Sequence, residues 1–162
     1  MRKLTEQCQC IVVVRVRGNV GVSKEIEEVL RQMHLTRKNH ATLITTSPSS
    51  NGTLRKVKDY ATWGHPSLEV LKELVAKRGM LTGNKKLTDD YVKEYLGYGS
   101  LGELSRALYE SRVELRNLEN VKPLFRLTPP RKGFRGSTKK PYSEGALGNR
   151  KEAIDSLLTR MI

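Results

Sequence analysis

The distribution of apolar and polar residues along the first third of the chain predicts strands separated by helices. Residues 11–16 form an almost continuous β-branched run, which is typical of a strand covered on both faces. Apolar residues then recur at helical spacing between 26 and 33, after Ser23, which is a favourable N-cap residue. Residues 41–46 are expected to form a second strand.

The next segment predicts a loop, a short helix and a third strand. Residues 48–52 read Pro-Ser-Ser-Asn-Gly, and each of these residue types favours turns, so we expect a loop. Leu54 and Val57 permit a short helix, and residues 60–63 can pair as a strand. This order favours an α/β (α+β) fold with helices on one face of a sheet, and a ferredoxin-like split βαβ core is the most economical closure.

The second half of the chain is mostly helical in pattern. Helices are expected after the capping residues Ser67, Thr88 and Ser100, and a final helix after Asn149. A short strand is expected at 124–128. We therefore predict two parts, a ferredoxin-like core at 1–65 and a mainly helical extension at 66–162 that includes a basic Gly/Pro-rich segment and the C-terminal helix.

That basic segment, residues 122–151, carries nine Lys or Arg and a single acid, Glu144. Its glycines and prolines leave few side chains to bury, so we expect little regular structure there in the absence of a partner. Phe134 and Tyr142 lie between the cations, where their rings would be free to stack on exposed bases. The alternative is a solvated loop with no partner.

The composition of the chain also bears on its size class and on its partner. A chain of 162 residues suits one core with an appended lobe. It contains 30 Lys plus Arg against 17 Asp plus Glu, which gives a net charge of +13 and indicates a polyanionic partner. A basic but inert surface is the alternative.

Other classes of protein have little support in the sequence. Cys8 and Cys10 form a C-x-C pair that cannot complete a four-ligand zinc site, and the three histidines lie in different predicted elements, so we expect no metal and no cofactor. Val20 occupies a position where an acetyl-coenzyme-A-binding loop needs Gly or Ala. Residues 11–14 are the longest apolar stretch, far too short to cross a bilayer. We expect a soluble cytoplasmic protein.

Two short clusters are candidates for contact with RNA. Arg37, Lys38, Asn39 and His40 supply donors for phosphate, ribose and base edges, although Asn39-His40 could equally be a turn followed by a strand residue. A second set of cations, at positions 55, 56 and 58, lies opposite the apolar residues of the predicted helix. That face could contact phosphate or simply face solvent.

Several runs in the chain resemble the archaeal form of the ribosomal protein L-thirty family, which is related to the eukaryotic large-subunit protein L-seven. The runs are Val-Arg-Val-Arg-Gly at 14–18, Leu-Thr-Arg-Lys-Asn-His at 35–40, Leu-Arg-Lys-Val-Lys-Asp-Tyr at 54–60, Pro-Pro-Arg-Lys-Gly-Phe at 129–134 and Gly-Ala-Leu-Gly at 145–148. Their order and spacing extend the resemblance over nearly the whole chain.

The resemblance implies a structural protein that assembles on large-subunit ribosomal RNA beside neighbouring ribosomal proteins, without catalysis, cofactor, membrane or small-molecule substrate. It also implies a set of RNA-facing residues: Arg37, Lys38, Asn39, His40, Arg55, Lys56, Lys58, Arg131, Lys132, Arg135, Lys139 and Lys140. A small RNA-modifying or nucleotide-using enzyme with an α/β core is the alternative hypothesis.

Overall fold

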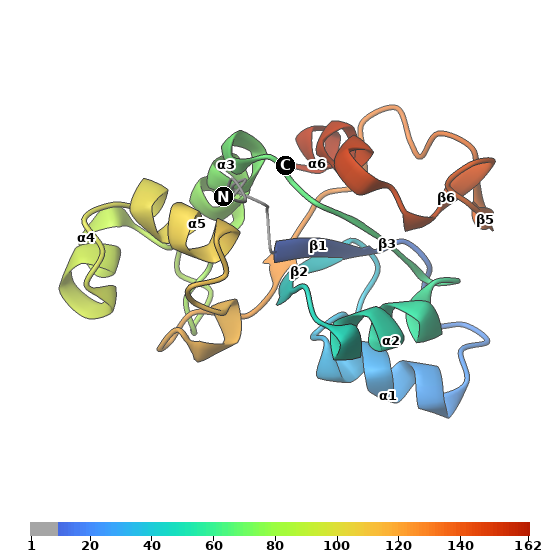
Figure 1. Ribbon diagram of the computed structural model, residues 1–162, viewed down its shortest axis with the longest axis horizontal. Helices are drawn as coiled ribbons and strands as arrows, with labels where there is room; N and C mark the ends of the chain where they lie inside the picture. Colours follow the sequence, from blue (N-terminus) through green and yellow to red (C-terminus); the bar gives the residue numbers. More distant parts are fainter. Residues whose placement is uncertain (1–9) are drawn as a thin grey trace, which may run out of the picture.

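A computed structural model describes residues 10–162 and contains a six-stranded sheet in the order β4-β2-β1-β3-β6-β5 (Figure 1). The strands are β1 (Cys10–Arg15), β2 (His40–Thr45), β3 (Ala61–Gly64), β4 (Phe125–Arg126), β5 (Ser137–Pro141) and β6 (Gly145–Asn149). The helices are α1 (Lys24–Gln32), α2 (Pro48–Val57), α3 (Leu68–Arg78), α4 (Asp89–Tyr91), α5 (Leu101–Tyr109) and α6 (Ile154–Met161). A π-helical turn η1 (Val92–Leu96) follows α4, and the 3-10 turns η2 (Leu115–Asn117) and η3 (Lys151–Ala153) precede β4 and α6.

The centre of the sheet has the predicted ferredoxin-like connectivity. β1 pairs antiparallel with β2 on one side and with β3 on the other, so that Val12 lies opposite both Leu43 and Gly64. β2 and β3 are therefore parallel to each other, and α2 connects them across β1. This is a split βαβ unit, and it confirms the predicted α/β fold class.

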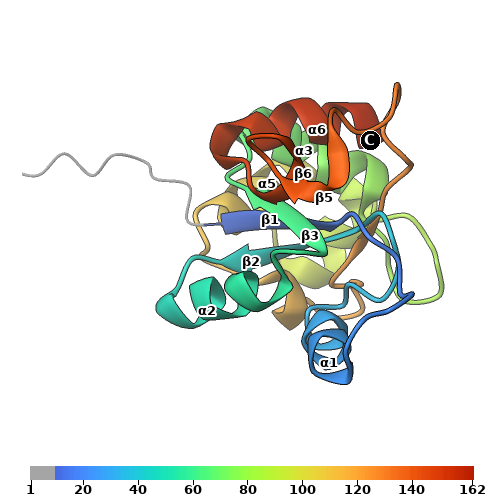
Figure 2. The ribbon, with the colours of Figure 1, turned by 90° about the vertical axis from the view of Figure 1, so that its right-hand side faces the viewer.

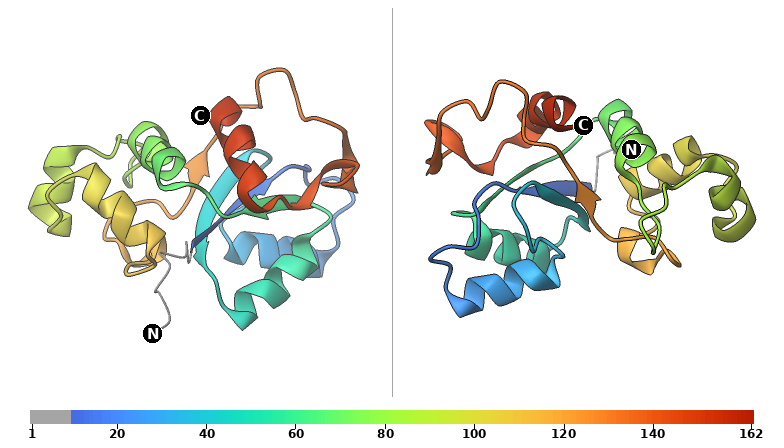
Figure 3. Two further views of the ribbon diagram at one scale, coloured as in Figure 1. Left: turned by 45° about the horizontal axis from the view of Figure 1, so that its top comes forward. Right: turned by 180° about the vertical axis from the view of Figure 1, so that it is seen from behind.

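The sheet is covered on both faces, which explains why β1 is buried along its whole length. α1 and α2 lie on one face, where Leu30 and Leu54 pack in one cluster with Val13. α3 and α6 lie on the other face, where Val12 packs in a second cluster with Leu157 (Figure 2). α4 and α5 extend the molecule on the side away from β5 and β6 (Figure 3). The core thus has two layers separated by the sheet.

The predicted loop at 48–52 is wrong, because these residues form the first half of α2. Ser47 caps the helix, and its hydroxyl oxygen accepts the N–H of Ser50 at 3.0 Å. Pro48 follows at the first helical position, where its missing N–H would have had no helical partner. Ser and Pro favour turns but also favour the first positions of a helix, and in this segment they begin a helix.

The helices predicted after Ser67, Thr88 and Ser100 are confirmed. Each hydroxyl accepts a hydrogen bond from the backbone N–H three residues further on. The final helix begins later than predicted. Asn149 belongs to β6, and its side-chain oxygen accepts the N–H of Lys151 at 2.8 Å, which starts η3 and not α6. Ser23 stands at the N-cap of α1 without a capping hydrogen bond from its side chain within the described residues.

The segment 122–151 is more regular than its composition suggested, since it contains β4, β5 and β6. β6 extends the sheet by pairing parallel with β3, with Thr62 opposite Gly148. Ala146 and Leu147 are buried there, and Phe134 packs against them. Strands β5 and β6 were not predicted from the sequence, because β6 depends on the edge of β3 for its hydrogen bonds and has only two buried apolar side chains, Ala146 and Leu147. The expectation that this segment is little ordered without a partner stays a prediction. The mainly helical extension therefore also contributes strands at both edges of the sheet.

Candidate nucleic-acid interface

One end of the sheet gathers chain segments that are far apart in the sequence. β1 ends where β2 and β3 begin, because both pair antiparallel with it. The N–H of Asn39 donates to the carbonyl of Arg15 at 2.8 Å, and the N–H of Val16 donates to the carbonyl of Tyr60 at 2.9 Å. Leu127, directly after β4, donates to the carbonyl of Asn39 at 3.1 Å. We call this region the basic end. It consists of segments 16–23, 33–39, 58–60 and 127–136 with the adjoining His40, Arg126 and last turn of α2, and it faces the viewer in Figure 2.

Arg15 holds two of these segments together from inside. Its side chain is 1% exposed and its guanidinium donates to the carbonyls of Leu35 at 2.7 Å, Arg17 at 2.9 Å and Gly18 at 3.2 Å. Burial lowers the pKa of Arg15, and nearby Glu27 and Tyr60 act in the opposite direction. This arginine fixes the loops on both sides of α1, so it positions the surface and does not belong to it.

The predicted cluster at 37–40 lies at the basic end. Arg37 and Lys38 are exposed, whereas Asn39 and His40 are half-buried. Asn39 adopts a left-handed backbone with φ 65°, which an Asn tolerates better than most residues. His40 begins β2 directly afterwards. The pair is thus a turn followed by a strand residue, and it lies beside two exposed cations. Its contact with RNA stays a prediction.

The predicted separation of a cationic face from an apolar face on α2 is confirmed. Arg55, Lys56 and Lys58 are exposed, whereas Leu54 and Val57 are buried against the sheet. These cations lie on the last turn of α2 and just after it. Because the helix runs toward the basic end, they lie there too.

Arg17 adds a cation that the sequence analysis did not assign to the site. Its guanidinium lies 5.0 Å from the centroid of the Tyr60 ring and donates to the carbonyl of Asp59 at 3.2 Å. The sequence signal was available, since Arg17 follows the buried strand at the point where the chain turns.

The cations of the long connection between β4 and β5 are also exposed, and the connection is fastened to α6. Arg131 donates through its N–H to the carbonyl of Arg160 at 3.0 Å, and the Arg160 guanidinium donates back to the carbonyl of Gly133 at 2.9 Å. Lys132 has a left-handed backbone with φ 62° in this turn. Arg135 is exposed beyond it. These hydrogen bonds give the connection a defined path along the basic end.

Lys139 and Lys140 lie apart from the loops, on the edge strand β5, and both are exposed. Lys140 forms an ion pair with Glu144 at 3.0 Å, and both side chains are largely exposed. The backbone N–H of Lys139 donates to the hydroxyl of Ser137 at 3.2 Å. The two lysines therefore extend the cationic surface to the outer edge of the sheet.

Two aromatic residues and one arginine of the basic segment contact the fold, and of these Phe134 differs from expectation. Phe134 is half-buried against the core, so its ring is not free to stack. Tyr142 is exposed on one side, and the Arg150 guanidinium lies 4.7 Å from its ring centroid. Arg150 is only 5% exposed and donates to the Thr62 hydroxyl at 2.9 Å and to the carbonyl of Ala146 at 3.0 Å. This arginine joins β3 to β6 and is not available to a partner.

The structure adds Arg126 to the cluster at 37–40. It lies directly opposite His40 in the antiparallel pairing of β2 and β4, and it is exposed. The sequence carried a signal for it, because Arg126 stands between Phe125 and Leu127, which are both buried, and so must point to the other side of the strand.

Two polar atoms inside this cluster are unsatisfied. Asn39 Oδ1 and His40 Nδ1 are buried and have no hydrogen-bond partner among residues 10–162. Burial lowers the pKa of His40, and the positive charges of Arg126, Arg37 and Arg15 lower it further. The imidazole is therefore neutral at pH 7, because its ordinary pKa of 6.5 already lies below that pH.

Comparison with known proteins decides the family. The model of the family described as ribosomal protein L30p/L7e matches residues 11–61. A protein of Methanosphaera stadtmanae is 47% identical over 151 residues, which cover 93% of this chain and 98% of the relative. This chain belongs to the L30p/L7e family. Relatives from Methanopyrus kandleri (47% identical, covering 91% of this chain and 100% of the relative) and Archaeoglobus fulgidus (44% identical, covering 92% and 97%) agree. All three relatives are named large ribosomal subunit protein uL30.

The L30p/L7e match contains most of the basic end. Residues 11–61 run from β1 to the first residue of β3, so they include segments 16–23, 33–39 and 58–60 and the cationic face of α2. The segment 127–136 and β5 lie outside this match, although the relatives align over nine-tenths of the chain.

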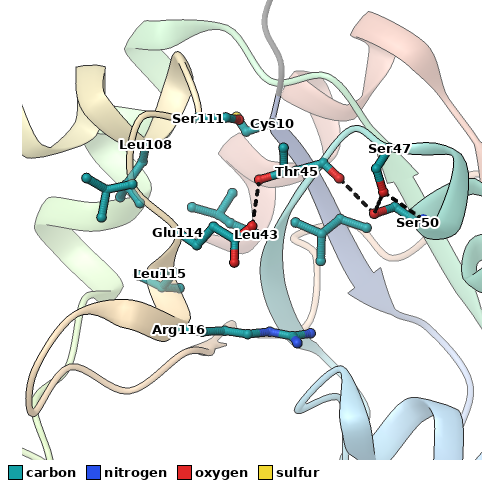
Figure 4. A pocket seen from close by; sticks show the side chains of 12 residues that line it. Cys10, Leu43, Thr45, Ser47, Ser50, Leu108, Ser111, Glu114, Leu115 and Arg116 are labelled. Atoms are coloured by element: carbon teal, nitrogen blue, oxygen red, sulfur yellow. Dashed lines mark hydrogen bonds between the residues drawn. The ribbon is translucent and has the colours of Figure 1, made fainter.

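This L30p/L7e chain also has a pocket of about 220 Å³ at the opposite end of β2 (Figure 4). Leu43 and Leu108 contribute apolar walls, and the Thr45 hydroxyl donates to Glu114 at 3.4 Å on one side. None of the residues proposed from the sequence lines it. Within residues 10–162, no three His, Cys, Asp or Glu side chains gather as a metal site would require, and no helix is long and apolar enough to span a bilayer. Cys8 lies outside the described residues.

Proposed function

We propose that this chain is a structural constituent of the large subunit of the cytoplasmic ribosome and that its basic end binds large-subunit ribosomal RNA. Membership of the L30p/L7e family and the shared name of the relatives support the ribosomal role. That name describes a component of an assembly and not a catalyst, so the chain is not an enzyme. The same reasoning makes neighbouring ribosomal proteins its further partners.

The observation that carries the RNA-binding proposal is the convergence of cations on one end of the sheet. The exposed cations there come from separate loops, from strand β4 and from the end of α2: Arg37, Lys38, Arg55, Lys56, Lys58, Arg126, Arg131, Lys132 and Arg135. A surface built from rigidly held loops can match the spacing of phosphates along a folded RNA, and each cation that meets a phosphate releases a counterion. Lys139 and Lys140 on β5 would extend the same surface.

The salt dependence of binding tests this proposal. Replacing Arg37, Lys38, Lys56 and Lys58 by Gln in one variant removes four charges from the basic end. Each phosphate contact contributes about 0.7 to 0.9 to the slope of log affinity against log salt, so four contacts should make the slope shallower by about 3 to 4. The control variant replaces Lys72, Lys85, Lys86 and Lys93, which are exposed on and around α3 and η1, far from the basic end. Filter binding with a large-subunit ribosomal RNA fragment at several salt concentrations gives both slopes.

Equal slopes for the two variants, both still folded by circular dichroism, would contradict the assignment of the basic end. Copurification tests the ribosomal role separately. A structural constituent should remain with large subunits through a high-salt sucrose gradient, whereas a loosely bound RNA-modifying enzyme should wash off.

A further inference from the structure

The two unsatisfied atoms at the basic end are unusual because they lie in a well-held part of the chain. Nearly all buried polar atoms in proteins have a hydrogen-bond partner, and an unpaired one costs free energy. The backbone of Asn39 donates to Arg15 and accepts from Leu127, so the turn is fixed on both sides. Asn39 Oδ1 and His40 Nδ1 are adjacent in sequence and both lack a partner within the described chain. A fixed turn that presents two unpaired atoms is incomplete without a further group.

The chemistry of the two atoms restricts what that group can be. The carbonyl oxygen of the Asn39 amide only accepts hydrogen bonds, so its partner must donate one. Phosphate oxygens only accept, so a phosphate held by the neighbouring cations leaves this atom unsatisfied. The neutral His40 ring can accept or donate at Nδ1, according to its tautomer. A hydroxyl group, which both donates and accepts, is suited to both atoms.

The surroundings of the pair supply the rest of a nucleotide site. Lys38 precedes the pair in the chain and Arg126 lies opposite His40 in the sheet, and both are exposed and long. Asn39 and His40 are half-buried, so part of each residue reaches the surface next to these cations. A phosphate and a hydroxyl side by side are the two groups that an RNA backbone repeats, since each ribose carries a 2′-hydroxyl beside its 3′-phosphate.

We infer that Asn39 and His40 form a subsite for a ribose 2′-hydroxyl, flanked by a phosphate bound to Arg37, Lys38 or Arg126, and that this subsite makes the basic end select ribose over sugars without that hydroxyl. The inference rests on the proposed binding of RNA and adds its chemical selectivity. The cations supply attraction to any polyanion, and the Asn39-His40 pair supplies the preference for RNA.

The test compares two forms of one RNA and two asparagine variants. The probe is a large-subunit ribosomal RNA fragment, made once with ordinary nucleotides and once with 2′-fluoro nucleotides, which keep the sugar pucker but cannot donate a hydrogen bond. Asn39→Gly removes the side chain, and glycine accepts the left-handed backbone at this position. Asn120→Gly is the matched control, because Asn120 has φ 56° and is exposed away from the basic end.

The wild type and Asn120→Gly should bind ordinary RNA roughly three- to tenfold more tightly than fluorinated RNA, as expected for one or two hydrogen bonds. Asn39→Gly should bind both forms equally, with an unchanged salt slope because no charge is removed. Its thermal midpoint should not fall, since the variant removes an unsatisfied atom.

Equal affinity of the wild type for the two RNAs, an equal loss by Asn39→Gly on both, or a lower thermal midpoint of that variant would overturn the subsite. Failure of RNA binding as a whole would look different, because the wild type would then bind neither RNA in a salt-dependent way.

Discussion

Arginine residues in this chain have two separate uses, and burial distinguishes them. Arg37 and Arg126 are exposed at the basic end, whereas Arg15 and Arg150 are 1% and 5% exposed and bind carbonyl oxygens of the fold. A guanidinium presents five N–H donors in a fixed plane, so one buried arginine can tie together backbone segments that no helix or strand connects. Sequence alone does not tell the two uses apart, because Arg15 and Arg126 are both flanked by apolar residues, yet Arg15 is buried and Arg126 is exposed.

Arg150→Met should destabilise the protein by about 2 kcal/mol or more, because it removes charge-assisted hydrogen bonds to Thr62 and Ala146 while keeping most of the side-chain volume. Arg135→Met makes the same chemical change at an exposed position and should change stability by less than about 0.5 kcal/mol. Urea unfolding measures both. Equal midpoints would show that Arg150 contributes nothing to the joint between β3 and β6.

The imidazole of His40 should titrate below its ordinary pKa of 6.5, because burial and the nearby arginines disfavour the charged ring. NMR titration of the ring protons measures this pKa, and the urea-unfolded chain should return it to about 6.5. In the window between the two values the unfolded chain binds more protons than the folded one, so acidification through that window lowers the free energy of unfolding. His40→Gln should lose less stability than the wild type over the same change. A folded-state pKa above 6.5 would contradict the burial argument.

At the scale of elements, replacing two glycines by alanine should change stability in opposite directions. Gly52 lies in α2 with open space where a side chain would be, so Gly52→Ala should stabilise the helix by about 0.5–1 kcal/mol. At Gly145 an added Cβ would lie 2.4 Å from the carbonyl oxygens of Ser137 and Lys140. Gly145→Ala should therefore separate β5 from β6 and lower the thermal midpoint. Thermal melts of the two variants check both signs, and a stabilised Gly145→Ala would mean that β5 does not pack as described.

Elements whose signals are local were predictable, and elements that depend on distant partners were not. The capped helices after Ser67 and Ser100 follow from residues within one turn. The pairing of β6 with β3, which in turn carries β5, does not, because it depends on an edge that lies some eighty residues earlier and on only two buried apolar side chains, Ala146 and Leu147. The clusters of the candidate site were visible as runs of cations. Their convergence required the strand register, which brings Asn39 beside Arg15 and Arg126 opposite His40.

At the scale of the whole molecule, the sheet couples the predicted core at 1–65 to the extension at 66–162. β4 adds to β2 and β6 adds to β3, so strands from both parts share one hydrogen-bonded sheet. Alternate residues of β1 enter opposite layers, with Val13 beside α1 and α2 and Val12 beside α3 and α6. Without the extension the face that carries Val12 would be open to water. The division into two parts remains a prediction about chain organisation, and this arrangement suggests that they unfold together.

Leu157→Ala tests that coupling, because Leu157 and the single tryptophan lie on opposite faces of the sheet. Leu157 is 0% exposed in α6, whereas Trp63 packs with the α1 and α2 layer and its fluorescence reports on that layer. Truncating a buried leucine removes about 2–5 kcal/mol of stability. If the parts unfold together, the Trp63 transition in urea should move to lower denaturant as far as the far-UV circular dichroism transition does. Leu30→Ala, in the Trp63 layer, is the control and should shift both signals equally. A Trp63 transition that stays at the wild-type midpoint in Leu157→Ala, while the circular dichroism transition moves, would show that core and extension fold independently despite their common sheet.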